Sequence, residues 1–148
     1  MPVVEIKGDL LESDCNVIAH CANAFCTMGS GVAKAIRAKY PEAYLADCMT
    51  TRGDRLKMGT VTRTVSQKDG RHIFNLYAQY NYGTETRQVD YEMMYRSLQN
   101  LKQGMKTIKD PVLALPRLGS GLAGGDWHVI KAMIEATFPD EIVYVYYL

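Results

Sequence analysis

The chain has 148 residues, of which 47% are hydrophobic and 22% charged, and its formal net charge is +1. This length suits one domain with a substantial core, and the near-neutral charge gives no basis for an extended nucleic-acid partner. No apolar run approaches the ~20 residues of a membrane span, and no charged segment typical of a secretory signal precedes the first strand-like run. We therefore expect a single domain over residues 1–148, monomeric and cytoplasmic, with no membrane partner.

The first half of the chain alternates strand-like and helix-like segments. Residues 3–7 and 16–21 read as strands, residues 32–40 carry apolar positions at helical spacing, and Pro41 is suited to the first turn of a following helix up to residue 51. Residues 61–66 and 72–77 alternate around an Asp-Gly turn, which predicts a hairpin. Strands and helices thus alternate along this half.

The second half continues the alternation. Residues 80–88 are polar and predict a loop, and residues 89–108 place apolar side chains on one helical face. A short strand over 112–115, a helix over 127–138 and a closing strand over 142–148 follow. The whole pattern predicts an α/β fold with helices on both sides of a mixed sheet.

Two glycine-rich segments, residues 28–32 and 118–127, each follow a strand-like run and precede a helix-like one. Glycine allows a positive φ and lets a ligand approach the backbone, and a helix N-terminus favours an anion. The first segment is neither a dinucleotide fingerprint, since Lys34 occupies its third glycine position, nor an ordinary Walker A loop. Together the segments predict a site for a diphosphate, and the four glycines from 119 to 125 exceed what a turn requires.

Four cysteines, at positions 15, 21, 26 and 48, lack the spacing of a zinc site. We expect reduced thiols, no metal and no cofactor. Three of the four lie near the first glycine-rich segment, which leaves a disulfide or a metal as the alternative.

Four single residues have both a functional and a structural interpretation. Asp9 follows the first strand, where it would face a ligand crevice or cap a turn, and Tyr146 would stack on a base or fill the core. His20 would exchange protons or form a buried hydrogen bond. Asp126 would activate water beside a phosphate or cap the last helix.

Four ordered blocks of the sequence resemble those of the macrodomain family. They are Lys7-Gly8-Asp9-Leu10, Ala19-His20-Cys21, Met28-Gly29-Ser30-Gly31-Val32-Ala33 and Pro116-Arg117-Leu118-Gly119-Ser120-Gly121-Leu122. The resemblance implies a three-layer α/β/α fold with a mixed central sheet and a cleft for ADP-ribose.

The resemblance also implies which residues touch the ligand. Asp9 would bind the adenine amino group, Leu10 would supply a backbone contact, Tyr146 would stack on adenine and Asn23 would lie near the distal ribose. The diphosphate and distal ribose would be wrapped by Gly29, Ser30, Gly31 and Val32 and by Arg117, Leu118, Gly119, Ser120, Gly121, Leu122 and Ala123.

Two branches of the family differ in mechanism. The branch that removes ADP-ribose from glutamate uses a lysine and an aspartate, where this chain has Gln79 and Ala123. An amide cannot form the lysine's covalent adduct, so we reject that mechanism. The resemblance to the ADP-ribose 1″-phosphate phosphatase branch implies His20 and Asp126 as the catalytic pair, in either order of acid and base. The alternatives are a non-catalytic ADP-ribose reader and a de-ADP-ribosylating hydrolase that needs no lysine.

Overall fold

The computed structural model describes residues 3–82, 89–119 and 124–148, and these residues build a six-stranded sheet. The strand order is β1-β6-β5-β2-β4-β3, and neighbouring strands are parallel except for the antiparallel pair β3 and β4. The strands are β1 (Val3–Lys7), β2 (Val17–Ala22), β3 (Val61–Val65), β4 (His72–Tyr77), β5 (Leu113–Pro116) and β6 (Val143–Tyr147). The helices are α1 (Gly31–Lys39), α2 (Pro41–Cys48), α3 (Tyr91–Met105) and α4 (Trp127–Thr137), with short 3₁₀ turns η1 (Leu10–Glu12) and η2 (Arg55–Lys57).

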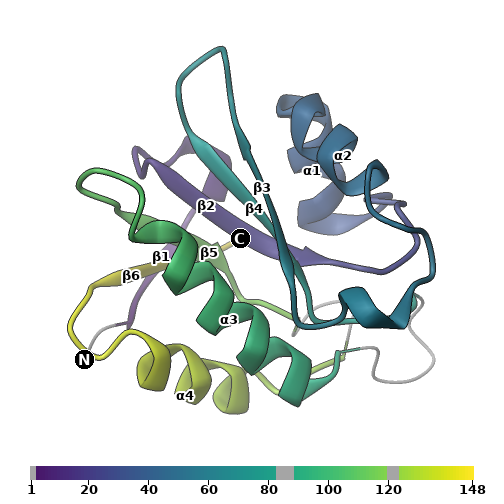
Figure 1. Ribbon diagram of the computed structural model, residues 1–148. Coiled ribbons are helices and arrows are strands. Elements are labelled where there is room, and N and C mark those ends of the chain that lie inside the picture. The colour runs from purple at the N-terminus through teal and green to yellow at the C-terminus, as the bar shows by residue number, and fades with distance from the viewer. Residues whose placement is uncertain (1–2, 83–88, 120–123) are drawn as a thin grey trace.

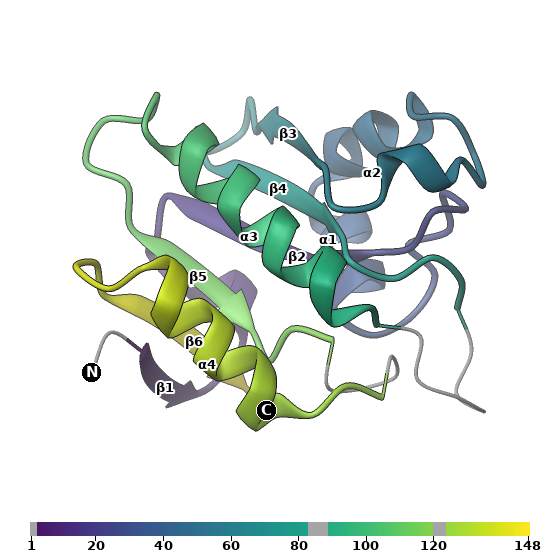
Figure 2. The ribbon, with the colours of Figure 1, turned by 60° about the horizontal axis from the view of Figure 1, so that its bottom comes forward.

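Helices cover both faces of the sheet, α3 and α4 on one side and α1 and α2 on the other (Figures 1 and 2). The alternation along β2 sorts its side chains between two cores. Val17 and Ala19 join the core that contains Leu98 of α3, whereas Ile18 joins the core that contains Ile36 of α1. The expected three-layer α/β/α arrangement with a mixed sheet is confirmed, and the parallel strands bring their carboxyl ends to one edge.

Most of the expected elements are confirmed, with small shifts at their ends. Helix α2 ends at Cys48 instead of residue 51, and the Thr50 hydroxyl donates to the Asp47 carbonyl just after that end. Helix α3 begins at Tyr91 because Asp90 caps it, while Val89 bridges to Gln79 as a short extended segment. The antiparallel hairpin of β3 and β4 is confirmed.

The expectation of four reduced thiols is wrong for two of the cysteines. Cys26 and Cys48 form a disulfide, with their Cα atoms 5.3 Å apart, whereas Cys15 and Cys21 are free. The segment that follows β2 reaches the end of α2 and places these two cysteines within bonding range. Their separation of 22 residues along the chain gave no sign of this contact.

Two glycines of the second glycine-rich segment are required by packing. A Cβ on Gly119, whose φ is +65°, would lie 2.9 Å from Val89 Cγ2, and a Cβ on Gly125 would lie 2.6 Å from Val89 Cγ1 and 2.7 Å from the Gly119 carbonyl oxygen. Gly119 and Gly125 therefore lie against each other and against Val89, so part of the glycine content of the segment reflects close packing and not ligand contact.

Replacing Gly125 by alanine should lower the free energy of unfolding by about 1–3 kcal/mol, because the new methyl group meets backbone and cannot be accommodated by a side-chain shift. Gly29→Ala is the matched control, since its Cβ would meet nothing closer than the Thr27 carbonyl oxygen at 3.7 Å. Urea denaturation of both variants measures the difference. Equal stabilities would contradict the packing requirement.

Candidate functional site

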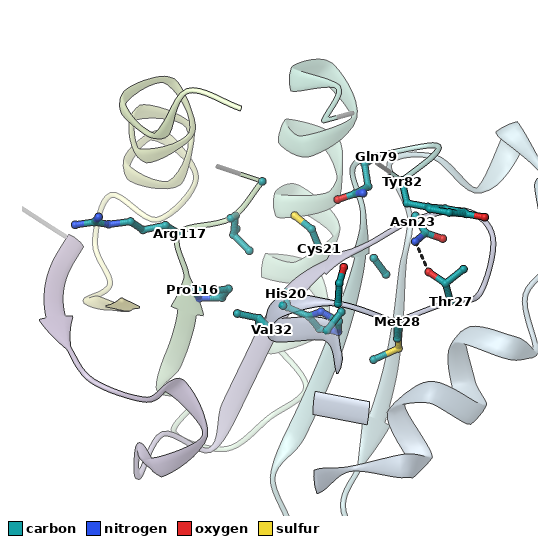
Figure 3. Close-up of a pocket in the computed structure, with 17 residues that line it drawn as sticks. His20, Cys21, Asn23, Thr27, Met28, Val32, Gln79, Tyr82, Pro116 and Arg117 are labelled. Carbon is teal, nitrogen blue, oxygen red and sulfur yellow. Dashed lines mark hydrogen bonds between the residues drawn. The ribbon is translucent and has the colours of Figure 1, made fainter. Parts of the chain in front are cut away.

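A cavity of about 570 Å³ opens at the carboxyl ends of β2 and β5 (Figure 3). Its volume lies within the range of small-molecule sites. Carboxyl ends of parallel strands are where open α/β sheets hold their ligands. The described residues that line it are His20, Cys21, Ala22, Asn23, Thr27, Met28, Gly29, Ser30, Gly31, Val32, Ala33, Gln79, Tyr82, Pro116, Arg117, Leu118 and Gly119. Both glycine-rich segments therefore contribute to one cavity wall.

The first glycine-rich segment brings the N-terminus of α1 to the cavity. Ser30 occupies the N-cap position with extended backbone and makes no side-chain cap bond, and Gly31 follows with a φ of +58°. The first N–H groups of the helix thus have no side-chain cap, and Gly29, Ser30, Gly31 and Val32 all line the cavity, as expected. This arrangement suits an anionic group such as a phosphate.

The second segment contributes its first two residues. Leu118 and Gly119 line the cavity, whereas the predicted ligand residues Ser120, Gly121, Leu122 and Ala123 lie outside the described residues. Arg117 also lines the cavity, but its guanidinium pairs with Glu5 at 3.1 Å and lies 4.1 Å from the ring centre of Tyr147. In Figure 3 its side chain points away from Cys21 and Gln79. The positive charge of Arg117 is therefore directed away from the cavity.

Neutral polar side chains stand at the end of the cavity next to Gln79. The Asn23 amide donates to the Thr27 hydroxyl at 2.6 Å, and its carbonyl oxygen accepts from the Phe25 N–H at 2.8 Å. Gln79 lines the cavity and donates to the Asn81 carbonyl. Among the described lining residues there is no lysine, aspartate or glutamate, so this wall supplies no charged nucleophile.

The residues expected to bind adenine do not line this cavity but lie at the same sheet edge. Tyr146 is paired in register with Pro116, which does line the cavity, and its ring packs against the core on the α1 side. Leu10 is buried, and one carboxylate oxygen of Asp9 accepts from the Leu11 N–H at 2.9 Å. The turn-cap interpretation of Asp9 thus holds for that oxygen, while its contact with adenine stays a prediction.

Of the two residues expected to be catalytic, only His20 lines the cavity. Its Nε2 lies 2.6 Å from Asn75 Oδ1, its side chain is 1% exposed, and burial lowers the pKa of His20 to about 4. Asp126 is exposed, and its carboxylate accepts from the His128 N–H at 2.9 Å as the N-cap of α4. In the structure His20 therefore forms a buried hydrogen bond and Asp126 caps a helix. These are the structural interpretations of the two residues in the sequence analysis.

Comparison with known sequences identifies the fold family. A sequence model of the Macro domain matches residues 19–134. The chain belongs to the Macro domain family. This macrodomain is 32% identical over 141 residues to the "Uncharacterized 17.5 kDa protein in tk-vs intergenic region" of Enterobacteria phage T4, an alignment that covers 91% of this chain and 89% of the phage protein.

A human protein and a bacterial structure extend the comparison. The macrodomain is 29% identical to the human "ADP-ribose glycohydrolase OARD1" over 141 residues, covering 92% of this chain and 84% of the human one. It also superposes on "Thermosipho africanus DarTG in complex with ADP-ribose" with a TM-score of 0.80, at 16% identity, over 97% of this chain and 41% of that one. The latter likeness is one of fold. The sequence relatives thus include a protein named as an ADP-ribose glycohydrolase.

Several cavity residues were not predicted to contact a ligand. Cys21, Ala22, Thr27, Met28, Ala33, Tyr82 and Pro116 all line the cavity. Thr27 directly precedes the first glycine-rich segment and Met28 is its first residue, and that position is the signal that could have found them. Burial raises the pKa of Cys21 to about 12, so its thiol is not a nucleophile at neutral pH.

Two features are absent from the described residues, a metal-binding cluster and a membrane-spanning helix. Within residues 3–82, 89–119 and 124–148 no group of three or more His, Cys, Asp or Glu side chains could hold a metal. No helix in the same ranges is long and apolar enough to cross a membrane.

The buried imidazole of His20 predicts a pH-dependent stability. The unfolded chain takes up a proton below the ordinary His value of 6.5, whereas folded His20 stays neutral down to about 4. The free energy of unfolding should therefore fall by up to a few kcal/mol as the pH drops from about 6.5 to about 4. His20→Gln should reduce this slope, because an amide does not titrate but can still donate to Asn75.

Urea denaturation at a series of pH values measures the effect, with His128→Gln on the exposed side of α4 as control. Identical slopes for wild type and His20→Gln would show that His20 does not carry the dependence.

Proposed function

We propose that this macrodomain binds ADP-ribose and hydrolyses ADP-ribose 1″-phosphate to ADP-ribose and inorganic phosphate. The observation that carries the proposal is the cavity wall, in which both glycine-rich segments and the N-terminus of α1 face one ligand-sized space. Two backbone segments of this kind suit a diphosphate, which is the central group of ADP-ribose. The glycohydrolase name of the human relative and the ADP-ribose complex of the Thermosipho africanus protein support the same ligand.

The charge of the cavity wall supports a substrate with an additional phosphate. The described lining residues include no carboxylate, and the side chain of Arg117 is paired with Glu5 outside the cavity. A terminal phosphate would therefore meet no like charge from these residues, and backbone N–H groups would provide its hydrogen bonds. The absence of a carboxylate from this part of the wall favours phosphate over a neutral leaving group.

The proposed reaction needs one water molecule. The water oxygen bonds to phosphorus, the bond between phosphorus and the 1″ oxygen breaks, and that oxygen receives a proton. Gln79, at the position where the glycohydrolase branch has lysine, cannot form a covalent adduct with the ribose. We propose that orientation of the bound phosphate and backbone hydrogen bonds provide most of the rate enhancement.

The test of the proposal combines binding with phosphate release. Calorimetry with ADP-ribose should give saturable one-site binding, and incubation with ADP-ribose 1″-phosphate should release inorganic phosphate. Binding without phosphate release would indicate a reader, and release of ADP-ribose from a protein or nucleic-acid conjugate would indicate the alternative hydrolase. No binding of ADP-ribose would contradict the proposal as a whole.

The adenine contact is tested separately. Asp9→Ala should weaken ADP-ribose by about tenfold, the effect of one hydrogen bond to a charged group, and leave ribose 5-phosphate unchanged because that ligand has no adenine. Calorimetry with both ligands gives the comparison. An equal loss for the two would exclude the contact.

Two substitutions of Asp126 distinguish a role as helix cap from a role in activating water. Asn caps a helix as well as Asp does, so Asp126→Asn should retain both stability and phosphate release, whereas Asp126→Ala should cost about 1 kcal/mol of stability. Thermal unfolding and a phosphate assay measure the two effects. If Asp126→Asn instead lost about 10²–10⁴-fold in rate at full stability, its carboxylate would be the group that activates water.

A further inference from the structure

Residues 26–30 form the part of the cavity wall that leads from the end of β2 into α1. The last four residues of this segment line the cavity. Among the residues that the structure describes, no backbone N–H group of residues 26–30 donates a hydrogen bond. No ladder of backbone hydrogen bonds therefore fixes the shape of this segment, and other contacts must do so.

The backbone of the segment has an unfavourable conformation at two of its residues. Cys26 has a φ of +60° and Met28 a φ of +39°, in the left-handed region that residues other than glycine rarely adopt. Such conformations persist only where the surrounding structure imposes them. Thr27 lies between these two residues, so its position in the cavity wall depends on what holds its neighbours.

The contacts of Thr27 and Met28 are local or lie inside the core. The Thr27 hydroxyl accepts from the Asn23 amide at 2.6 Å (Figure 3), and its carbonyl oxygen accepts from the Arg37 guanidinium at 3.0 Å. Asn23 belongs to the same loop, and Arg37 belongs to the helix that the segment begins. Met28 is buried, with 2% of its surface exposed.

Cys26 is held differently, through its disulfide with Cys48 at the end of α2. Helix α2 is itself anchored to the sheet, because its buried Ala43 shares a core with Ile18 of β2. The disulfide therefore connects the cavity segment covalently to the helix layer beside it. It acts at one of the two residues whose backbone needs an external restraint.

The disulfide is accessible to a reductant at one of its sulfur atoms. Cys48 is exposed, whereas Cys26 is half-buried. The other two cysteines do not compete for exchange, because burial raises the pKa of the Cys15 thiol and raises the pKa of Cys21 to about 12. Both thiols stay protonated at neutral pH, and a thiol exchanges with a disulfide only as the thiolate.

We infer that the disulfide between Cys26 and Cys48 is a redox site that controls the ligand affinity of the cavity, and that its reductant is a dithiol. This inference rests on the proposed binding of ADP-ribose. A thiolate of the dithiol forms a bond to Cys48 Sγ, the bond between the two cysteine sulfurs breaks, and Cys26 leaves as a thiolate that takes up a proton.

The second thiol of the reductant completes the reaction. It attacks its own partner sulfur in the mixed disulfide, which releases Cys48 as a thiol and leaves the reductant as a cyclic disulfide. The protein gains two electrons and two protons, and the dithiol loses them. A single thiol is a poorer reductant here, because the Cα atoms of Cys26 and Cys48 are 5.3 Å apart and the freed Cys26 would displace it again.

Reduction removes the restraint on Cys26 and leaves the contacts of Thr27 and Met28 in place. The backbone at Cys26 then relaxes from the left-handed region, and only a fraction of the molecules keeps the cavity wall in its binding shape. The apparent affinity falls by that fraction. The reduced protein should therefore bind ADP-ribose about tenfold more weakly than the oxidised protein.

Equilibrium dialysis with ADP-ribose tests the inference on wild-type protein that is oxidised in air or reduced with dithiothreitol. Alkylation followed by mass spectrometry should count two thiols in the oxidised protein and four in the reduced protein. Cys48→Ser removes the disulfide outside the cavity. This variant should bind as weakly as the reduced wild type and should not respond to dithiothreitol. Four thiols in the oxidised protein, or equal affinities of its two forms, would overturn the inference.

NMR of the protein without ligand separates this inference from the proposed function. The amide resonances of Gly29 and Ser30 should shift on reduction, whereas that of Gly104 on α3 should not. If ADP-ribose bound to neither form, the proposed function would be wrong and the control of affinity would fall with it. Equal binding of ADP-ribose to both forms, with unchanged Gly29 and Ser30 resonances, would remove the redox control alone.

Discussion

The proposed anion site depends mainly on hydrogen-bond donors of the backbone. The described cavity wall contains no lysine, and the guanidinium of Arg117 is held outside it by Glu5. Apart from neutral side chains such as Ser30 and Gln79, the hydrogen-bond donors must therefore come from main-chain N–H groups. These groups are oriented only if two loops keep a fixed shape at the edge of a parallel sheet. The strand order brings β2 and β5 side by side, so that the loops that follow them meet. Anion binding at the proposed site thus requires both the shape of the loops and the strand order of the sheet.

Close packing restrains the second of these loops at Gly119 and Gly125. Gly119 and Gly125 approach Val89, and Val89 bridges to Gln79 on the cavity side. The same small set of contacts therefore connects the backbone of the loop to the polar end of the cavity. A change in packing at Val89 would be felt at both places, because interiors packed at this density transmit displacements.

The fold was predictable from the sequence to a large extent, because it rests on local signals. The alternation of residues 72–77 and the helical spacing of residues 91–105 are properties of short segments, and so is Pro41 at a helix start. The first glycine-rich segment was likewise recognised from its place between strand and helix. What the sequence could not provide depends on register and on contacts between distant segments. His20 meets Asn75 only because β2 and β4 pair with that offset, and the pairing of Cys26 with Cys48 requires the end of α2 to lie beside the loop after β2.

The sequence also could not predict the direction of the Arg117 side chain. An arginine next to a glycine-rich segment suggests phosphate binding, and only the position of Glu5 on β1 reveals the competing ion pair. The number of glycines was similarly ambiguous, because ligand approach and close packing both exclude a Cβ. For Arg117 and for the glycines, the residue type indicated a possible role. The residues that lie next to them in the structure determined which role they have.

The disulfide has a topological effect that extends beyond the two sulfur atoms. It closes a covalent ring over the chain from Cys26 to Cys48, which contains the first glycine-rich segment and all of α1 and α2. A ring of this size limits how far its ends can separate after the sheet has come apart, which reduces the conformational entropy of the unfolded ensemble. The first glycine-rich segment and both helices of that layer therefore stay within one covalent ring even in the unfolded chain.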